Sequence, residues 1–348
     1  MNEDILKTHL KESVSGKCYL LCGDEEYTKD HYVRQFIKRV EALPIPEFNL
    51  LTFCGKAFTP HAVASAMEDL PYMSDYKLIF ISEVELSKLS EGVVTELIEV
   101  LEGMPDYANV LILARSNELS QKILNKKEKA PVSTLIAYLE KNGLVVSFET
   151  QTGLKLKKWV KRHFDAANTP ISDGALEHMI ALCGEDMYTL HGEARKLVAY
   201  CNGREVKKAD IEAVCCVNEN YRIFDLTKAL TARNTKQVHD IYNNLIKSGS
   251  SPYMIINMLS SCITDMTVVK AGIESGKSIQ DIAKILKTFD WAVRNYAPFV
   301  RKVDFGYLEY AATKCNECAL ALKSYRTDPA TAVEFFLLKL SAYEKDKA

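Results

Sequence analysis

The sequence has 348 residues, which is enough for two or three domains of ordinary size. Apolar residues make up 47% and charged residues 26%, with only 15 Gly and 10 Pro, a composition that excludes collagen-like and disordered chains. The 44 Lys and Arg against 46 Asp and Glu give a net charge of -2, which excludes a chain that coats nucleic acid or an anionic membrane over its whole surface.

The N-terminal segment, MNEDILKTHLKESVSG, carries charges throughout and lacks the apolar run of a secretory signal, so no targeting segment is expected. No later stretch reaches the roughly 20 apolar residues of a membrane span. Most of the ten cysteines lie inside apolar segments, as reduced and buried thiols do. These features predict a cytoplasmic protein without membrane contact.

Residues 1–150 alternate between short apolar runs and helical patterns. The runs are nearly continuous in apolar residues, which is typical of parallel strands buried on both faces of a sheet. They lie at 18–22, 48–53, 78–81, 110–113 and 144–148. We therefore expect a three-layer α/β domain with a five-stranded parallel sheet over residues 1–150.

From about residue 153 the strand pattern ends and helical periodicity continues to the C-terminus. Turn residues near 168–170, 201–203 and 248–252 divide the helices. The pattern predicts a small helical domain over 151–217 and an all-α domain over 218–348. The last helix is expected to run from Asp328, as N-cap, and Pro329 to about Lys345.

A degenerate phosphate-binding loop follows the first strand. Gly23 and Lys29 take the places of the first glycine and the lysine of GxxxxGK[ST], but Thr28 and Asp30 replace the second glycine and the magnesium-binding hydroxyl. The intervening DEE carboxylates would repel phosphate oxygens and instead suit the first turn of a helix. Ser82 likewise stands where an ATPase carries the aspartate that organises magnesium. We expect no bound triphosphate, no cofactor and no catalytic residue.

Other candidate sites are weaker. A basic helical run around Trp159 could contact DNA phosphates, although a solvated helix face is the simpler interpretation. Its charged members are Lys155, Lys157, Lys158, Lys161 and Arg162. Lys126–Lys129 reads as an exposed loop. The histidines lack ligand spacing and Cys315 and Cys318 have no second pair, so no metal site is expected.

The segment Leu70-Pro71-Tyr72-Met73 is an apolar exception before the third strand. Large apolar side chains at a helix end, broken by a proline, could face solvent and dock into a partner. They could equally cover the core beneath the strand. The sequence leaves both possibilities open.

The chain resembles the delta subunit of the bacterial DNA polymerase III clamp loader. The resemblance rests on the order and spacing of several segments and on the missing nucleotide chemistry, and it covers essentially the whole chain. The segments are CYLLCGDEEY at 18–27, LPYMSDYKLIFISEVE at 70–85, GEDMYTLHGEARKL at 184–197 and IFDL at 223–226.

The resemblance implies an AAA+-like subunit that binds and opens the sliding clamp without binding ATP. The family's clamp-binding apolar pair falls on Pro71 and Tyr72, flanked by Leu70 and Met73. Proline replaces the aliphatic residue of the best-known member, so Tyr72 is the expected anchor. No catalysis is implied for the chain itself, although the holoenzyme is a DNA-directed DNA polymerase.

The implied partners are the clamp, primed DNA and the other loader subunits, of the ATP-binding tau/gamma type and the delta-prime type. The helices from about 218 would form a collar with those subunits. Phe335, Phe336, Leu338 and Leu340 would then serve the bundle core or subunit contacts, with the core as the safer assignment. Two alternatives remain: a replication NTPase with a divergent phosphate loop, and a DNA-binding module that uses the helix near Trp159.

Overall fold

The computed structural model describes residues 2–116, 118–119, 121–124, 130–286, 290–323 and 328–343. They belong to two compact units, Met1–Gln151 and Thr152–Ala348, which are described separately. The basic cluster Lys126–Lys129 and the expected helix end near Lys345 lie outside the described residues.

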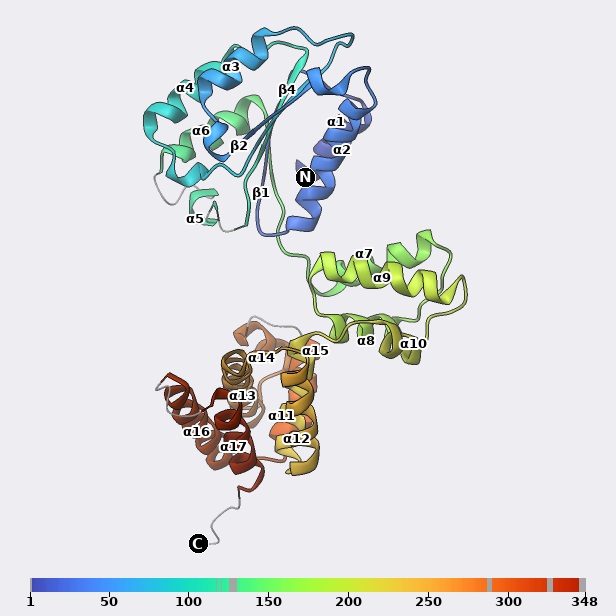
Figure 1. Cartoon of the computed structure of the whole chain (residues 1–348), viewed down its shortest axis with the longest axis vertical. Helices are drawn as coiled ribbons and strands as arrows, with labels where there is room; N and C mark the ends of the chain where they lie inside the picture. Colours follow the sequence, from blue (N-terminus) through green and yellow to red (C-terminus); the bar gives the residue numbers. More distant parts are fainter. Residues whose placement is uncertain are drawn as a thin grey trace. The chain divides into compact units, whose positions relative to one another are not determined.

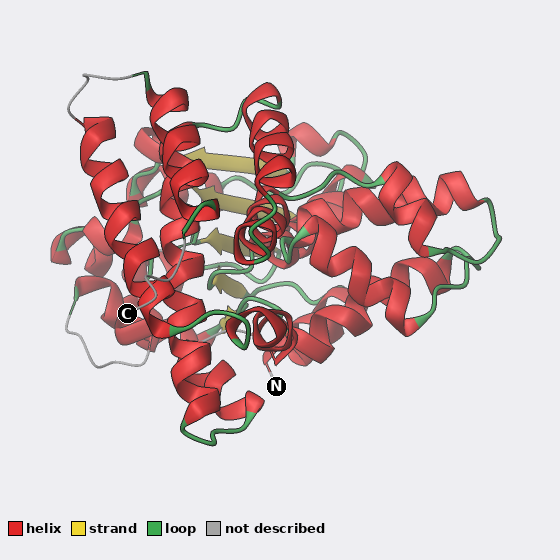
Figure 2. Ribbon diagram, turned by 90° about the horizontal axis from the view of Figure 1, so that it is seen from below, coloured by secondary structure: helices red, strands yellow, loops and turns green. Residues whose placement is uncertain are grey.

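The first unit contains the expected five-stranded parallel sheet, in the order β2-β3-β4-β1-β5 (Figure 1). The strands are β1 (Cys18–Cys22), β2 (Leu50–Cys54), β3 (Lys77–Ser82), β4 (Ala108–Leu113) and β5 (Leu144–Ser147). In register, Cys18 pairs with Val110 and Leu50 with Leu78. The fold class predicted for this part of the chain is confirmed. Figure 2 shows strands only in this sheet, and the other regular elements of the described residues are helical.

The second strand starts two residues later than predicted. Phe48 belongs to a 3-10 turn, Pro46–Phe48, which follows Ile45 in a left-handed conformation with φ of 52°. Asn49 then leads into β2 at Leu50. The apolar character of Phe48 suggested a strand residue, but its backbone turns before the pairing with β3 begins.

Helices cover both faces of the sheet. They are α1 (Asn2–Lys11), α2 (Glu26–Glu41), α3 (Pro60–Glu68), α4 (Glu91–Glu102), α5 (Gln121–Leu124) and α6 (Pro131–Asn142). Figure 1 shows α1 and α2 on one face and α3, α4 and α6 on the other. Alternate strand residues serve the two faces: Tyr19 and Leu21 pack with Phe36 of α2, whereas Leu20 packs with Leu97 of α4. Both faces are therefore buried, as the apolar runs predicted.

The second unit is helical, apart from an isolated bridge between Ile171 and Val206. Its first helices are α7 (Gly153–Ala166), α8 (Asp173–Cys183), α9 (Met187–Cys201) and α10 (Lys208–Val214). The following helices are α11 (Glu219–Thr231), α12 (Thr235–Lys247), α13 (Pro252–Glu274), α14 (Ile279–Leu286), α15 (Asp290–Val300), α16 (Phe305–Lys323) and α17 (Pro329–Ser341). Asp328 caps α17 as predicted, accepting a hydrogen bond from the Thr331 N–H. A division at 217/218 is proposed from the sequence alone.

One helix departs from the expectation that no stretch has the length of a membrane span. Helix α13 has 23 residues, and its length and composition would allow it to cross a membrane. In the fold, however, its side chains enter two hydrophobic clusters of the helical unit. Ile255 and Leu259 belong to one cluster, and Met266 and Val269 to the other. The fold therefore buries part of this helix, 33% of its apolar 18-residue window.

Candidate functional sites

The degenerate phosphate loop lies at the carboxyl ends of two neighbouring strands. Gly23 follows β1, and Ala114 to Ser116 follow β4, which pairs with β1. Carboxyl ends of parallel strands are where α/β folds place their ligands. The loop therefore occupies the position at which a nucleotide would be expected in this fold.

Lys29, at the place of the phosphate-binding lysine, is fully buried and bonded within the protein. Its ammonium group donates to the backbone oxygens of Gly23 and Ala114, at 2.7 and 2.8 Å, and to the Glu26 carboxylate at 2.9 Å. An ammonium group has three hydrogens. All three donors of Lys29 thus have partners from the chain itself.

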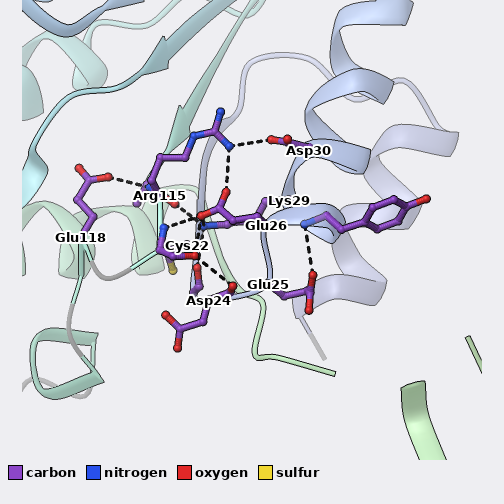
Figure 3. Close-up of polar contacts among 12 residues, drawn as sticks. Cys22, Asp24, Glu25, Glu26, Lys29, Asp30, Arg115 and Glu118 are labelled. Carbon is purple, nitrogen blue, oxygen red and sulfur yellow. Dashed lines mark hydrogen bonds and ion pairs between the residues drawn. The ribbon is translucent and has the colours of Figure 1, made fainter. Parts of the chain in front are cut away.

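Glu26 is at the centre of the polar network that fills the loop (Figure 3). Its carboxylate accepts from the Ser116 N–H and hydroxyl, at 2.5 and 2.6 Å, and from Arg115 at 2.9 Å. Burial alone would raise the pKa of Glu26, but the hydrogen bonds from Ser116, Lys29 and Arg115 lower it to about 2. The carboxylate is therefore ionised and receives the donors that a bound anion would otherwise receive.

Asp30 and Ser82, two further substituted positions, also have partners within the protein. Asp30, which replaces the magnesium-binding hydroxyl, lies 2.9 Å from the Arg115 guanidinium. Glu25 accepts from the Tyr27 N–H as the N-cap of α2, whereas Thr28 is only half-buried. Ser82, at the end of β3, is 3.1 Å from the Cys54 sulfur. Arg115 is a central residue of this network that sequence reasoning missed, because its partners lie 85 and 89 residues earlier.

The apolar segment before β3 is exposed. Leu70 is 75% exposed, Tyr72 49% and Met73 67%, whereas Pro71 is half-buried. Met73 has a left-handed backbone, with φ of 49°, where the segment turns toward the strand. Of the two possibilities left open by the sequence, exposure is therefore correct for three of the four side chains.

The side chain of a buried asparagine, Asn49, fixes the backbone of this segment by hydrogen bonds. The Asn49 side chain donates to the Tyr72 carbonyl at 2.9 Å and accepts from the Tyr72 N–H at 2.8 Å. Asn49 has no exposed surface. Lys77, also buried, donates to the carbonyls of Ala66 and Asp69 at the end of α3. The exposed side chains are therefore carried by a fixed backbone.

Phe48 joins the exposed segment, which sequence reasoning missed. Its ring is 59% exposed and lies 5.4 Å from the Tyr72 ring between centroids. Phe48 precedes β2 and Tyr72 precedes β3, and these strands are neighbours, so their amino ends meet at one edge of the sheet. Pro46, two residues before Phe48, could have indicated that the strand had not yet begun, because proline is disfavoured inside strands. We call Phe48, Leu70, Tyr72 and Met73 the apolar tip.

The basic run on α7 is partly neutralised. Lys157 lies 3.1 Å from Asp173 and 2.8 Å from Glu177, and Lys161 lies 3.6 Å from Asp173. Trp159 is half-buried and packs edge-on against His163. The exposed members of the run are Lys155, Lys158 and Arg162.

The C-terminal apolar residues divide between core and surface. Phe336 and Leu340 are buried, whereas Phe335 is 59% exposed and Leu338 lies at the surface. Cys315 and Cys318 are both buried, and each donates a weak S–H bond to a helix carbonyl, those of Ile256 and Ala332. The two cysteines are thus packed as ordinary helix residues.

Comparison with known proteins gives a consistent result. A model of the DNA polymerase III delta subunit matches residues 19–149, and a model of the C-terminal domain of that subunit matches residues 220–340. The DNA polymerase III subunit delta of Bacillus subtilis is 22% identical over 345 residues, covering 97% of this chain and 96% of its own length. A "Probable DNA polymerase III subunit delta" of Aquifex aeolicus is 23% identical over 185 residues, covering 53% of this chain and 50% of its own.

The solved structure of the Bacillus subtilis DNA clamp loader delta protein shares the fold. It superimposes with a TM-score of 0.61 at 19% sequence identity, covering 99% of this chain and 100% of the other. One family model lies in each compact unit, residues 150–219 are matched by neither model, and the structural likeness covers 99% of the chain.

Proposed function

Because the chain belongs to the DNA polymerase III delta subunit family, we propose that it binds and opens the sliding clamp during DNA replication without binding ATP itself. The observation that carries the proposal is the apolar tip, whose three segment residues are 49–75% exposed. Apolar side chains gathered at one edge of a domain are typical of a surface that a partner covers.

The tip is suited to insertion into a pocket on the clamp. Tyr72 and Phe48 supply two aromatic rings in contact, and Leu70 and Met73 flank them. Aromatic anchors dominate the binding free energy of many interfaces, and a backbone fixed in advance lowers the entropy lost on binding. Opening would follow if the tip binds the open ring more tightly than the closed ring.

The polar network around Lys29 supports the proposal that ATP is not bound here. The lysine that would hold phosphate oxygens is buried and has three protein acceptors. A phosphate group would have to displace the ionised Glu26 carboxylate from Lys29, Ser116 and Arg115. The nucleotide chemistry of the assembly would then belong to the tau/gamma-type subunits.

The remaining partners are proposed from the family. The helices from 218 onward would form a collar with the tau/gamma-type and delta-prime-type subunits, with the surface residues Phe335 and Leu338 available for contacts. The chain would act in the cytoplasm. Lys155, Lys158 and Arg162 would be the exposed charges that approach primed DNA, which would appear as a salt-dependent affinity of the full chain for primed DNA.

The tip is tested by surface plasmon resonance with the full chain and the sliding clamp of the same organism. We expect the double substitution Tyr72→Ala and Met73→Ser to weaken binding by about 2–4 kcal/mol, or roughly 30-fold to 1,000-fold, because it removes an anchor ring and its neighbour. Phe48→Ala should cause a smaller loss. Wild-type affinity should be the same with and without ATP.

Tyr188→Ala is the matched control, because Tyr188 is a 40% exposed tyrosine on α9 and should leave clamp affinity unchanged. Unchanged affinity of the double variant would show that the tip is not the clamp contact. ATP retained by the chain in a filter-binding assay would favour the alternative of a replication NTPase with a divergent phosphate loop.

A further inference from the structure

Three buried side chains with metal-binding donors meet in the helical unit, and none of them belongs to the sites described above. They are Cys183 at the end of α8, Glu193 within α9 and Cys215 directly after α10. Their donor atoms all lie within 4.8 Å of one another. The exposed fractions of the three residues are 1%, 6% and 7%, so the donors converge inside the protein and not on its surface.

The backbone brings the three residues together without a ligand. Helix α8 ends at Gly184, with φ of 86°, directly after Cys183. The Asn218 N–H bonds to the Leu182 carbonyl at 2.8 Å, and the Asn218 side chain donates to the Cys183 carbonyl at 3.4 Å. These bonds tie the segment that carries Cys215 back onto the end of α8. The donor set is therefore preformed.

The Glu193 carboxylate is held in place by neighbours that would remain once a metal is bound. Its Oε2 atom lies 2.7 Å from the Lys196 ammonium and accepts from the Cys216 N–H at 3.3 Å. Partners of this kind orient a metal-binding carboxylate. The Lys196 charge also offsets the excess of negative charge that two thiolates and a carboxylate leave on a divalent cation.

The donor types select the metal. Thiolates favour zinc over magnesium or calcium, which prefer oxygen ligands. Ligands at 2.0–2.3 Å from a tetrahedral zinc ion lie roughly 3.3–3.8 Å apart, so side-chain movements of about 1 Å would close the set. Cys216, the next residue and an exposed thiol, or a water molecule could complete the tetrahedron.

We propose that Cys183, Glu193 and Cys215 form a zinc-binding site that fixes the segment following α10 against α8 and α9. Binding deprotonates both thiols, so two protons leave for each zinc ion bound, and a third leaves where Cys216 is the fourth ligand. Because its ligands are buried among helices, the zinc ion would add its binding free energy to folding. The site is independent of clamp binding by the other unit.

The test uses the reduced, metal-free full chain and cobalt(II) as a spectroscopic substitute for zinc. We expect one cobalt ion per chain, with thiolate-to-cobalt charge transfer and the intense visible bands of tetrahedral coordination. Cys183→Ser and Cys215→Ser should each abolish or strongly reduce the charge transfer. Glu193→Gln should weaken cobalt binding by at least about 10-fold, since a ligand is removed. Zinc should displace the cobalt.

Cys54→Ser is the matched control, because Cys54 is an exposed thiol in the other unit, and it should leave the spectrum unchanged. Wild-type cobalt uptake without thiolate charge transfer would overturn the proposal even if the variants fail to fold. A Cys215→Ser spectrum equal to that of the wild type would overturn it too. So would a Cys183–Cys215 disulfide, found by peptide mass mapping, with no cobalt bound after reduction.

Discussion

Gly23 occupies the position of the first glycine of the phosphate-loop motif, but its role here is to allow a close approach of two backbone segments. A Cβ atom on Gly23 would lie 2.3 Å from the Phe148 carbonyl oxygen and 2.7 Å from the Phe148 nitrogen. Its φ of 98° is also one that other residues rarely adopt. The Phe148 N–H bonds to the Cys22 carbonyl just before Gly23, so two strand ends approach closely here. The glycine is required by this close approach.

We therefore expect Gly23→Ala to destabilise the protein by more than about 3 kcal/mol, because a backbone clash adds to the 1–2 kcal/mol of a left-handed non-glycine residue. Gly203→Ala is the matched control: its φ is 85°, but no atom lies within 4 Å of the added Cβ. It should lose only about 1–2 kcal/mol. Urea unfolding followed by circular dichroism measures both, and equal losses would contradict the close approach at Gly23.

For single residues, the sequence shows which positions depart from the motif, but it does not predict which residues those side chains contact. Thr28 and Asp30 depart from the phosphate-loop motif, and the sequence alone shows that departure. The burial of Lys29 and the role of Arg115 could not be predicted, because they depend on contacts between residues 85 to 90 positions apart. Tyr72 could be singled out by its chemistry and its place before a strand, but its exposure is decided by which surfaces the fold leaves uncovered.

Among the secondary-structure elements, the strands were the most predictable. All five predicted strand ranges agree with the structure to within two residues at each end. The strands β1, β3 and β4 read as nearly continuous apolar runs because almost all of their residues are buried. The second strand is displaced because the 3-10 turn at Pro46–Phe48 takes its predicted start. That displacement is what places Phe48 beside Tyr72.

Asn49 lies directly before β2 and holds the segment before β3, so replacing it should affect both elements. Asn49→Ala leaves the Tyr72 N–H and carbonyl without partners, and we expect a loss of about 1–3 kcal/mol of stability. Clamp affinity should fall as well, although Asn49 itself is buried. Equilibrium unfolding and surface plasmon resonance measure the two effects.

Two further substitutions make that experiment specific. Asn49→Asp keeps the acceptor for the Tyr72 N–H and loses the donor to its carbonyl, so it should keep part of the clamp affinity. Asn142→Ala, at the exposed end of α6, should change neither quantity. Full clamp affinity in a folded Asn49→Ala protein would show that the fixed backbone is not needed for binding.

For the whole molecule, the hydrophobic clusters follow the two compact units. Leu111 belongs to a cluster of the first unit and Leu259 to a cluster of the second, and none of the clusters found among the described residues mixes the two. Each unit therefore has a core of its own. The sequence predicted a boundary near residue 150, from the change from β-α alternation to continuous helical periodicity, and a further division at 217/218 that stays a prediction. The contacts between helices inside the second unit could not be predicted from the local sequence.

Separate cores predict separate unfolding transitions. Leu111→Ala and Leu259→Ala each remove a fully buried side chain and should cost about 2–5 kcal/mol within their own unit. In differential scanning calorimetry, each variant should lower one transition and leave the other in place. A single transition that moves with both variants would show that the units unfold as one cooperative body.

The closed network around Lys29 also limits how this chain can evolve. Changing Asp30 to a hydroxyl residue removes one of the two carboxylates that hold Arg115, and losing Glu26 leaves a buried ammonium group without its counter-charge. Each single step toward a phosphate-binding loop therefore costs stability before it gives any new binding. A phosphate-binding loop at this place would therefore need several substitutions at once, because Glu26, Lys29, Asp30 and Arg115 are held by one another.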